Sequence, residues 1–106
     1  MTINELRDEA YNIAKKHGWH EWESNPLVVH ALIHSEISEA TEEVRSSKEP
    51  IYFKDGKPEG EALELADAVI RIDDYFGERG WDLEEAIKQK MVFNKVRSYR
   101  HGGKKY

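Results

Sequence analysis

The chain has 106 residues, a net charge of −5 and no cysteine, which excludes disulfide bonds and thiolate chemistry. This length fits a single domain over residues 1–106. The hydrophobic content of 39% is too high for a disordered chain, but the charged content of 35% leaves little material for a core. We therefore expect oligomerisation, as a homodimer or homotetramer, to complete the fold.

Membrane association and export are not expected. No segment approaches the ~18 consecutive apolar residues of a membrane span. The first residues also lack the basic stretch and apolar run of a signal peptide. We expect a soluble, cytoplasmic protein without a membrane partner.

Two helices are predicted in the first half of the chain. The first spans residues 3–17, because Thr2 and Glu5 form a capping-box pattern at its start and Gly18 is a natural stop. The second spans residues 25–46 and begins with an asparagine, a capping residue, followed by a proline suited to the first turn. Apolar residues follow one face of each segment, as in helices that pack on a core.

A loop and two further helices follow. In the loop at residues 46–58, the Ile-Tyr-Phe run at 51–53 could form a β-bridge or anchor the loop to the core. The third helix is predicted over residues 60–76 and ends at Gly77. The fourth spans residues 82–99 and starts with an aspartate in a capping position. Four helices with mostly short connections predict an all-α, four-helix bundle-like fold.

Two acidic pairs carry the strongest chemical signal. Glu36 and Glu39 lie on the second predicted helix, and Glu64 and Asp67 lie on the third. Residues three positions apart leave the same face of a helix, with Cβ atoms roughly 5–6 Å apart. Carboxylates at the edge of an apolar face, without basic partners one turn away, need another source of positive charge. The pairs predict a site for Mg²⁺ or Mn²⁺, although solvent-facing helix surface is the plain alternative.

The C-terminal segment is basic. Residues 88–106 carry seven lysines and arginines and no acid, whereas the other 87 residues carry nine basic and 21 acidic side chains, a charge of −12. Lys90, Asn94 and Arg97 share one face of the fourth helix. Lysine and arginine donate to phosphate oxygens, and asparagine can bind a base edge or a sugar. We expect a phosphate clamp over the acidic pairs, although basic residues are common near helix C-termini.

Histidines and tryptophans give weaker signals. His30 and His34 are one helical turn apart, but no Glu-x-x-His motif accompanies them, so we expect a structural role. Trp19, Trp22 and Trp81 fall in or beside connections between helices. We expect them to cap the core, and the alternative is that one of them, with Trp19 as the candidate, stacks on a base.

Together these motifs resemble a MazG-like nucleotide pyrophosphohydrolase of the all-α nucleoside triphosphate pyrophosphohydrolase superfamily, over nearly the whole chain. The resemblance rests on Gly18-Trp19, LIHSEISEATEE, the GKPEG loop at 56–60, ELAD at 64–67 and the ending KMVFNKVRSYRHGGKK. Many relatives carry another carboxylate where this chain has Ser35.

The resemblance implies both ligands and an activity. The implied metal ligands, for Mg²⁺ with Mn²⁺ able to substitute, are Glu36, Glu39, Glu64 and Asp67. It also implies that Lys90, Asn94, Arg97 and the basic residues after them face the nucleotide. Members of the family cleave a nucleoside triphosphate between its α and β phosphates, giving a monophosphate and pyrophosphate.

The residues then take distinct roles in hydrolysis. Glu36 or Glu39 would accept the proton of the attacking water. Lys90 and Arg97, with Arg100 or Lys104, would meet the charge on the leaving pyrophosphate. The rival interpretation is a non-catalytic helical protein that binds a partner or nucleic acid through its basic C-terminal segment. Nucleic acid is the less favoured partner, because the rest of the chain is strongly acidic.

Overall fold

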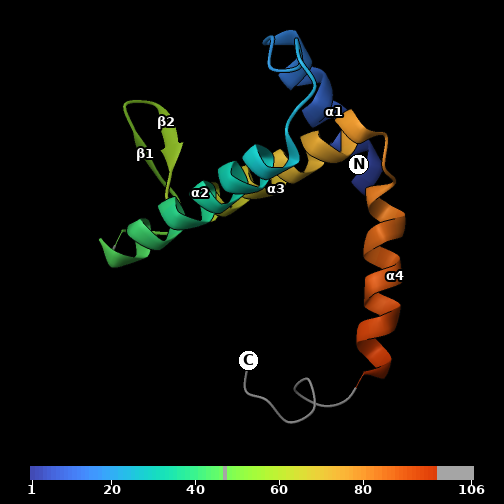
Figure 1. Cartoon of the computed structure of the whole chain (residues 1–106). Coiled ribbons are helices and arrows are strands. Elements are labelled where there is room, and N and C mark those ends of the chain that lie inside the picture. The colour runs from blue at the N-terminus through green and yellow to red at the C-terminus, as the bar shows by residue number, and fades with distance from the viewer. Residues whose placement is uncertain (47, 98–106) are drawn as a thin grey trace.

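The computed structural model describes residues 1–46 and 48–97, and it confirms the all-α class. In chain order the elements are α1 (Ile3–Lys16), α2 (Pro26–Arg45), β1 (Tyr52–Lys54), β2 (Lys57–Glu59), α3 (Glu61–Arg79) and α4 (Leu83–Val96). Helices α2 and α3 lie side by side, and α1 packs against α3 near the end of this pair. Helix α4 contacts α1 and projects away from the α2–α3 pair (Figure 1).

Three of the predicted helix starts are confirmed by side-chain caps. The Thr2 hydroxyl accepts a hydrogen bond from the Glu5 amide at 3.1 Å, and the Asn25 side chain accepts one from the amide two residues later at 2.9 Å. Asp82 accepts a hydrogen bond from the Glu85 amide at 2.9 Å. Each such cap stabilises its helix by about 1 kcal/mol.

The predicted end of α3 was wrong, because Gly77 is a packing residue. The helix continues to Arg79 and ends at Gly80, whose φ of 69° is in the left-handed region. A Cβ atom at Gly77 would lie 2.5 Å from the Cβ of Tyr11 on α1. The glycine therefore allows α1 and α3 to approach closely, a requirement that the sequence of α3 alone does not reveal.

The loop between α2 and α3 forms a short hairpin. Strands β1 and β2 pair antiparallel, with Tyr52 opposite Glu59. Asp55 and Gly56, both with positive φ, form the two-residue turn that suits such a hairpin. The Tyr52 hydroxyl donates to the Glu43 carboxylate at 2.9 Å and so fixes the hairpin to α2. The hairpin thus brings one additional acidic residue, Glu59, toward Glu64 at the start of α3.

The core of a single chain is small. Within residues 1–46 and 48–97, the buried apolar residues are Ala10, Ala14, Ala40, Ala68, Tyr75 and Leu83. Asp73 is buried with them, only 1% exposed, and burial raises the pKa of its carboxyl. Large apolar side chains stay exposed on α2, α3 and α4. No helix among the described residues is long and apolar enough to cross a membrane.

Candidate metal and nucleotide site

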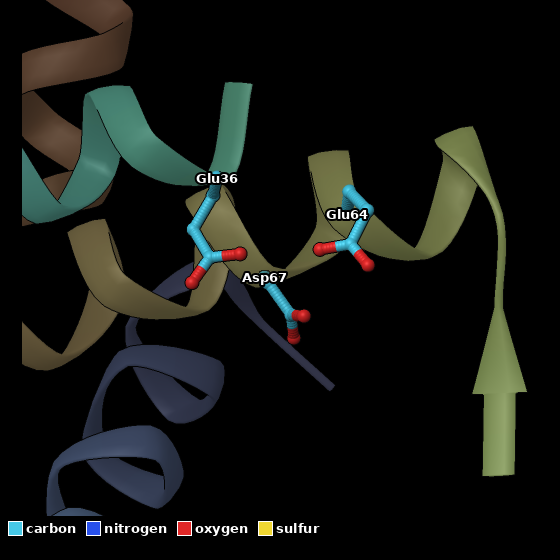
Figure 2. A group of neighbouring side chains, drawn as sticks. All are labelled: Glu36, Glu64 and Asp67. Atoms are coloured by element: carbon cyan, nitrogen blue, oxygen red, sulfur yellow. The ribbon is translucent and has the colours of Figure 1, made fainter. Parts of the chain in front are cut away.

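Three of the four predicted metal ligands meet between α2 and α3. Glu36 comes from α2, and Glu64 and Asp67 come from one face of α3. One carboxylate oxygen from each lies within 4.8 Å of the others, and Figure 2 shows all three carboxylates directed into the same space. We call these three residues the acidic cluster. Because the helices lie side by side, residues 28 or more positions apart in sequence become neighbours.

Glu39 lies beside the acidic cluster and not within it. Its side chain is exposed, and it lies close enough to raise the pKa of the Glu64 carboxyl. Both residues line an open hollow that also includes Glu43 of α2 and Glu59 of β2. Glu43, Glu59 and Glu64 form a second group whose carboxylate oxygens lie within 4.8 Å of one another. Glu64 therefore belongs to two groups of carboxylates.

The crowding of carboxylates raises their pKa values. Burial first, and then the neighbouring Glu39, Asp67 and Glu36, raises the pKa of Glu64 to about 7. Burial and the charge of Glu36 also raise the pKa of Asp67. The cluster therefore resists full ionisation at neutral pH unless a cation is present. This donor set, made of carboxylate oxygens only, fits Mg²⁺ or Mn²⁺.

This repulsion gives a testable dependence of stability on pH. The pKa of Glu64 rises from an ordinary 4.5 to about 7 on folding, so between these pH values the folded state binds more protons than the unfolded state. The metal-free protein should therefore lose stability as the pH rises through this range. Scanning calorimetry in EDTA at pH 5 and pH 8 measures the change.

Divalent cations should reverse this loss, because a metal replaces the proton. Mg²⁺ or Mn²⁺ should raise the melting temperature more at pH 8 than at pH 5. Because other groups titrate as well, the Glu64→Gln variant serves as the reference, and its stability should change less over this range than that of the wild type. Equal pH dependence of the two proteins would contradict the assignment.

A basic partner that the sequence analysis did not recognise lies at the acidic cluster. Arg71 lies four residues after Asp67 on α3, and its Nε donates to Oε1 of Glu36 at 2.9 Å. Glu36 is only 8% exposed, so this ion pair is partly shielded from water. The expectation that no basic residue lies one turn from the acidic pairs was wrong. The spacing was the signal that could have found it, since Arg71 continues the stripe that Glu64 and Asp67 begin.

Lys90 and Asn94, the predicted phosphate-binding residues that lie on the described part of α4, do not meet the acidic cluster within one chain. Lys90 and Asn94 lie exposed on α4, which points away from the α2–α3 pair (Figure 1). Arg97 is exposed directly after α4. Arg100 and Lys104 lie outside the described residues. No clamp over the cluster is formed by residues 48–97 of the same chain.

The direction of α4 has a local cause. The Arg7 guanidinium donates to the Trp81 carbonyl at 2.8 Å, and the Asn4 side chain donates to Asp82 at 2.9 Å. These contacts fix the short α3–α4 connection against α1. Helix α4 then projects away from the α2–α3 pair and not along the face that carries the carboxylates (Figure 1).

A cavity of about 160 Å³ lies next to the acidic cluster. Trp19, Val29, Leu32 and Tyr75 supply its apolar lining, and Arg71 is among its polar residues. Trp19 lines this cavity. Because 68% of its surface is exposed, it does not cap the core as predicted. The cavity has aromatic and aliphatic surface that suits a planar ring.

The other two tryptophans and His30 differ in how they pack. Trp81 packs edge-on against Tyr75 and Phe76, with ring centroids 5.6 and 5.5 Å apart, as expected of a residue that caps a core. Trp22 is largely exposed, which contradicts a capping role. His30 packs edge-on against Tyr75, in keeping with the structural role predicted for it.

The sequence analysis missed His20, which fixes the loop between α1 and α2. Its Nδ1 lies 2.8 Å from Glu78 and its Nε2 lies 2.5 Å from Asp74, both on α3. Burial lowers the pKa of His20, but the hydrogen bonds and charges of these two carboxylates outweigh burial and raise it. Ser24 adds two hydrogen bonds to Glu78. The loop that carries Trp19 is thus attached to α3 by an ionic hydrogen-bond network.

No protein-family model, curated protein or solved structure matches this chain. The interpretation of the site therefore depends on its residues and their geometry. The resemblance of the motifs to MazG-like enzymes stays a prediction.

Proposed function

We propose that this chain is a Mg²⁺-dependent nucleoside triphosphate pyrophosphohydrolase, which cleaves its substrate into a nucleoside monophosphate and pyrophosphate. The observation that carries the proposal is the acidic cluster of Glu36, Glu64 and Asp67, with oxygens within 4.8 Å of one another. A cavity with an aromatic lining adjoins it through Arg71. The resemblance to MazG-like enzymes supports the same activity.

The residues of the acidic cluster would hold the metal, and Glu39 lies next to them, in the same hollow as Glu64. A Mg²⁺ ion bound there would neutralise phosphate charge and lower the pKa of nearby water, and Mn²⁺ can take its place. The raised pKa of Glu64, about 7, is what such a set of donors has before a cation neutralises it. The fit between donors and ion is therefore good.

The nucleoside has a place in the neighbouring cavity. Trp19 and Tyr75 offer aromatic surface to a base, and Val29 and Leu32 complete an apolar lining. With the base in this cavity, the triphosphate extends past Arg71 toward the acidic cluster. The order of base, sugar and phosphates along the protein then follows from the order of cavity, Arg71 and carboxylates.

Hydrolysis at the α-phosphorus is the reaction that we infer. The oxygen of a water molecule forms a bond to this phosphorus, while the bond to the bridging oxygen breaks and its electron pair leaves with pyrophosphate. The water proton passes to a carboxylate and then to solvent. We favour Glu39 over Glu36 as the acceptor, because Glu36 already accepts a hydrogen bond from Arg71 whereas Glu39 is exposed to water.

Replacement of Glu39 by glutamine should therefore abolish turnover. The amide keeps the shape of the side chain but does not accept a proton, and loss of a general base lowers the rate by roughly 10²–10⁴-fold. The helical circular-dichroism spectrum should survive, because Glu39 is exposed. Glu9→Gln, which removes one charge from an exposed glutamate on α1, is the matched control. Full activity of the Glu39 variant would remove this residue from the reaction.

A second copy of the chain would complete the enzyme. Large apolar residues on α2, α3 and α4 are exposed in one chain, and the basic residues of α4 lie apart from the carboxylates of that chain. A homodimer or homotetramer would cover the apolar faces and offer Lys90, Asn94 and Arg97 to another copy. Analytical ultracentrifugation measures the state directly, and a monomer at micromolar concentration would contradict this part of the proposal.

The activity is tested with a panel of ribo- and deoxyribonucleoside triphosphates in Mg²⁺. The expected products are monophosphate and pyrophosphate, and diphosphate with free phosphate would contradict the proposal. In water enriched in ¹⁸O, the label should enter the monophosphate if attack occurs at the α-phosphorus, and the pyrophosphate if it occurs at the β-phosphorus. EDTA should stop the reaction.

The second candidate function is non-catalytic binding of a partner or of nucleic acid. It is favoured by the projection of α4, which exposes Lys88, Lys90 and Lys95 together with Met91 and Phe93. Such binding would persist in EDTA and release no phosphate from any nucleotide. Steep loss of duplex binding with added salt would identify nucleic acid as the partner.

A further inference from the structure

Arg71 holds a position that its ion pair with Glu36 does not fully explain. It belongs to α3, a helix of 19 residues, and its side chain is 37% exposed. Only Nε donates to Glu36. Its two terminal nitrogens make no hydrogen bond to other residues in the ranges 1–46 and 48–97. A guanidinium has five donors, so most of this group's hydrogen-bonding capacity is unused.

The guanidinium lies at the boundary between the two parts of the proposed site. On one side it contacts Glu36 of the acidic cluster, and on the other it lines the cavity with Trp19 and Tyr75. A nucleotide with its base in the cavity and its outer phosphates at the carboxylates has its α-phosphate at this boundary. The α3 helix and the hydrogen bond to Glu36 together restrict the position of the guanidinium, so it is already placed to bind an α-phosphate at this boundary.

We propose that Arg71 is a substrate-binding catalytic residue, which donates its two terminal nitrogens to the non-bridging oxygens of the α-phosphate while Nε stays on Glu36. This inference rests on the proposed function and adds to it the residue that contacts the scissile group. The planar fork of an arginine matches two phosphate oxygens, and its charge stabilises those oxygens most when negative charge grows on them during attack.

The ion pair between Arg71 and Glu36 allows a competing explanation for the position of Arg71, in which it only orients Glu36. The two roles differ in what they require. A residue that orients Glu36 affects metal binding before any nucleotide is present. A residue that binds the α-phosphate affects nucleotide affinity and turnover, and leaves metal affinity nearly unchanged.

The experiment compares wild type with Arg71→Gln and Arg71→Lys. Manganese affinity is measured without nucleotide, and Kd is measured for the α,β-methylene analogues of dATP, dCTP, dGTP and dTTP, whose α–β bond does not hydrolyse. We expect Arg71→Gln to keep Mn²⁺ affinity within about threefold but to lose about 100-fold in kcat/KM and at least about tenfold in analogue affinity. Arg71→Lys keeps the charge but lacks the planar fork of donors, so its kcat/KM and analogue affinity should lie between those of wild type and Arg71→Gln.

Chemical rescue gives a further readout. Guanidinium ion added to Arg71→Ala should restore part of the turnover, because it fills the site with the missing group. Arg45→Gln is the matched control, since Arg45 lies on the surface of α2 and pairs with exposed Glu42, and its activity should equal that of the wild type.

The outcomes separate the two proposals. Hydrolysis by wild type with equal kcat/KM in Arg71→Gln overturns the role of Arg71 and leaves the proposed function intact. Loss of Mn²⁺ affinity with unchanged analogue affinity also overturns it, in favour of a role in orienting Glu36. If wild type hydrolyses no triphosphate, the proposed function fails, and equal analogue binding by wild type and Arg71→Gln would then overturn the role of Arg71 as well.

Discussion

Replacement of Glu64 by glutamine should lower kcat by at least about 100-fold and at the same time stabilise the metal-free protein. The two effects have one cause. Glu64 shares its carboxylate between two acidic groups and is crowded enough for its pKa to rise to about 7. A neutral amide removes a proposed metal ligand and also removes repulsion with Glu39, Asp67 and Glu36. Activity and stability should therefore change in opposite directions.

The measurement combines turnover in Mg²⁺ with melting temperature in EDTA at pH 8. Glu9→Gln, an exposed change on α1 that alters net charge by the same amount, is the control for general charge effects. It should change neither quantity. A Glu64→Gln variant that melts below wild type in EDTA, or that keeps wild-type kcat, would contradict the interpretation of the acidic cluster.

Replacement of His20 by alanine should be the most destabilising single change in the α1–α2 loop. The His20 side chain is 7% exposed and lies between Asp74 and Glu78, so its removal leaves two shielded carboxylates without their shared partner. Removal of one partner from a buried pair costs about 3 kcal/mol or more. In a domain of this size that corresponds to a fall in melting temperature of more than about 10 °C.

The direction in which the stabilising effect of His20 changes with pH also follows from its raised pKa. The pKa of His20 is raised above its ordinary 6.5, so its stabilising effect is complete below pH 6.5 and disappears as the pH rises through the raised value. The difference in stability between wild type and His20→Ala should therefore be large at pH 6 and small at pH 10. His34→Ala, an exposed histidine on α2, is the control. Equal differences at both pH values would show that His20 acts by packing alone.

The network around His20 has a further consequence for substrate binding. Trp19 precedes His20 and lines the cavity, so the ionic hydrogen bonds that attach the loop to α3 also set the position of an aromatic wall. The loop is connected to α3 from its other end by Ser24, whose carbonyl accepts from Arg79. In the proposed nucleotide site, the stability of this loop and the affinity for a base should therefore be coupled through α3.

Helix starts and the acidic cluster are the parts that could be predicted from sequence. A cap such as that of Thr2 or Asp82 is a hydrogen bond between residues three apart, so local sequence contains both partners. The acidic pairs follow the same logic, because residues three apart share a helix face. That Glu36 meets Glu64 and Asp67 required only that their two helices lie side by side.

Residues whose roles depend on another element were missed or misjudged. Gly77 was predicted to end the helix, because the sequence of α3 does not indicate that Tyr11 of α1 packs against it. Arg71 continues a visible stripe, but its partner Glu36 is 35 positions away. His20 sits near a turn without any motif, and its two carboxylates lie more than 50 positions later.

The sequence by itself determined the helices, their capped starts and the pairs of carboxylates, because each depends on interactions within a turn or two of the chain. Only the tertiary structure decided that α4 contacts α1 and projects away from the α2–α3 pair, that Arg71 donates to Glu36, and that Trp19 lines a cavity beside them. These depend on the angles at which helices pack, and those angles are set by contacts between residues far apart in sequence, such as Tyr11 with Gly77 and Arg7 with Trp81.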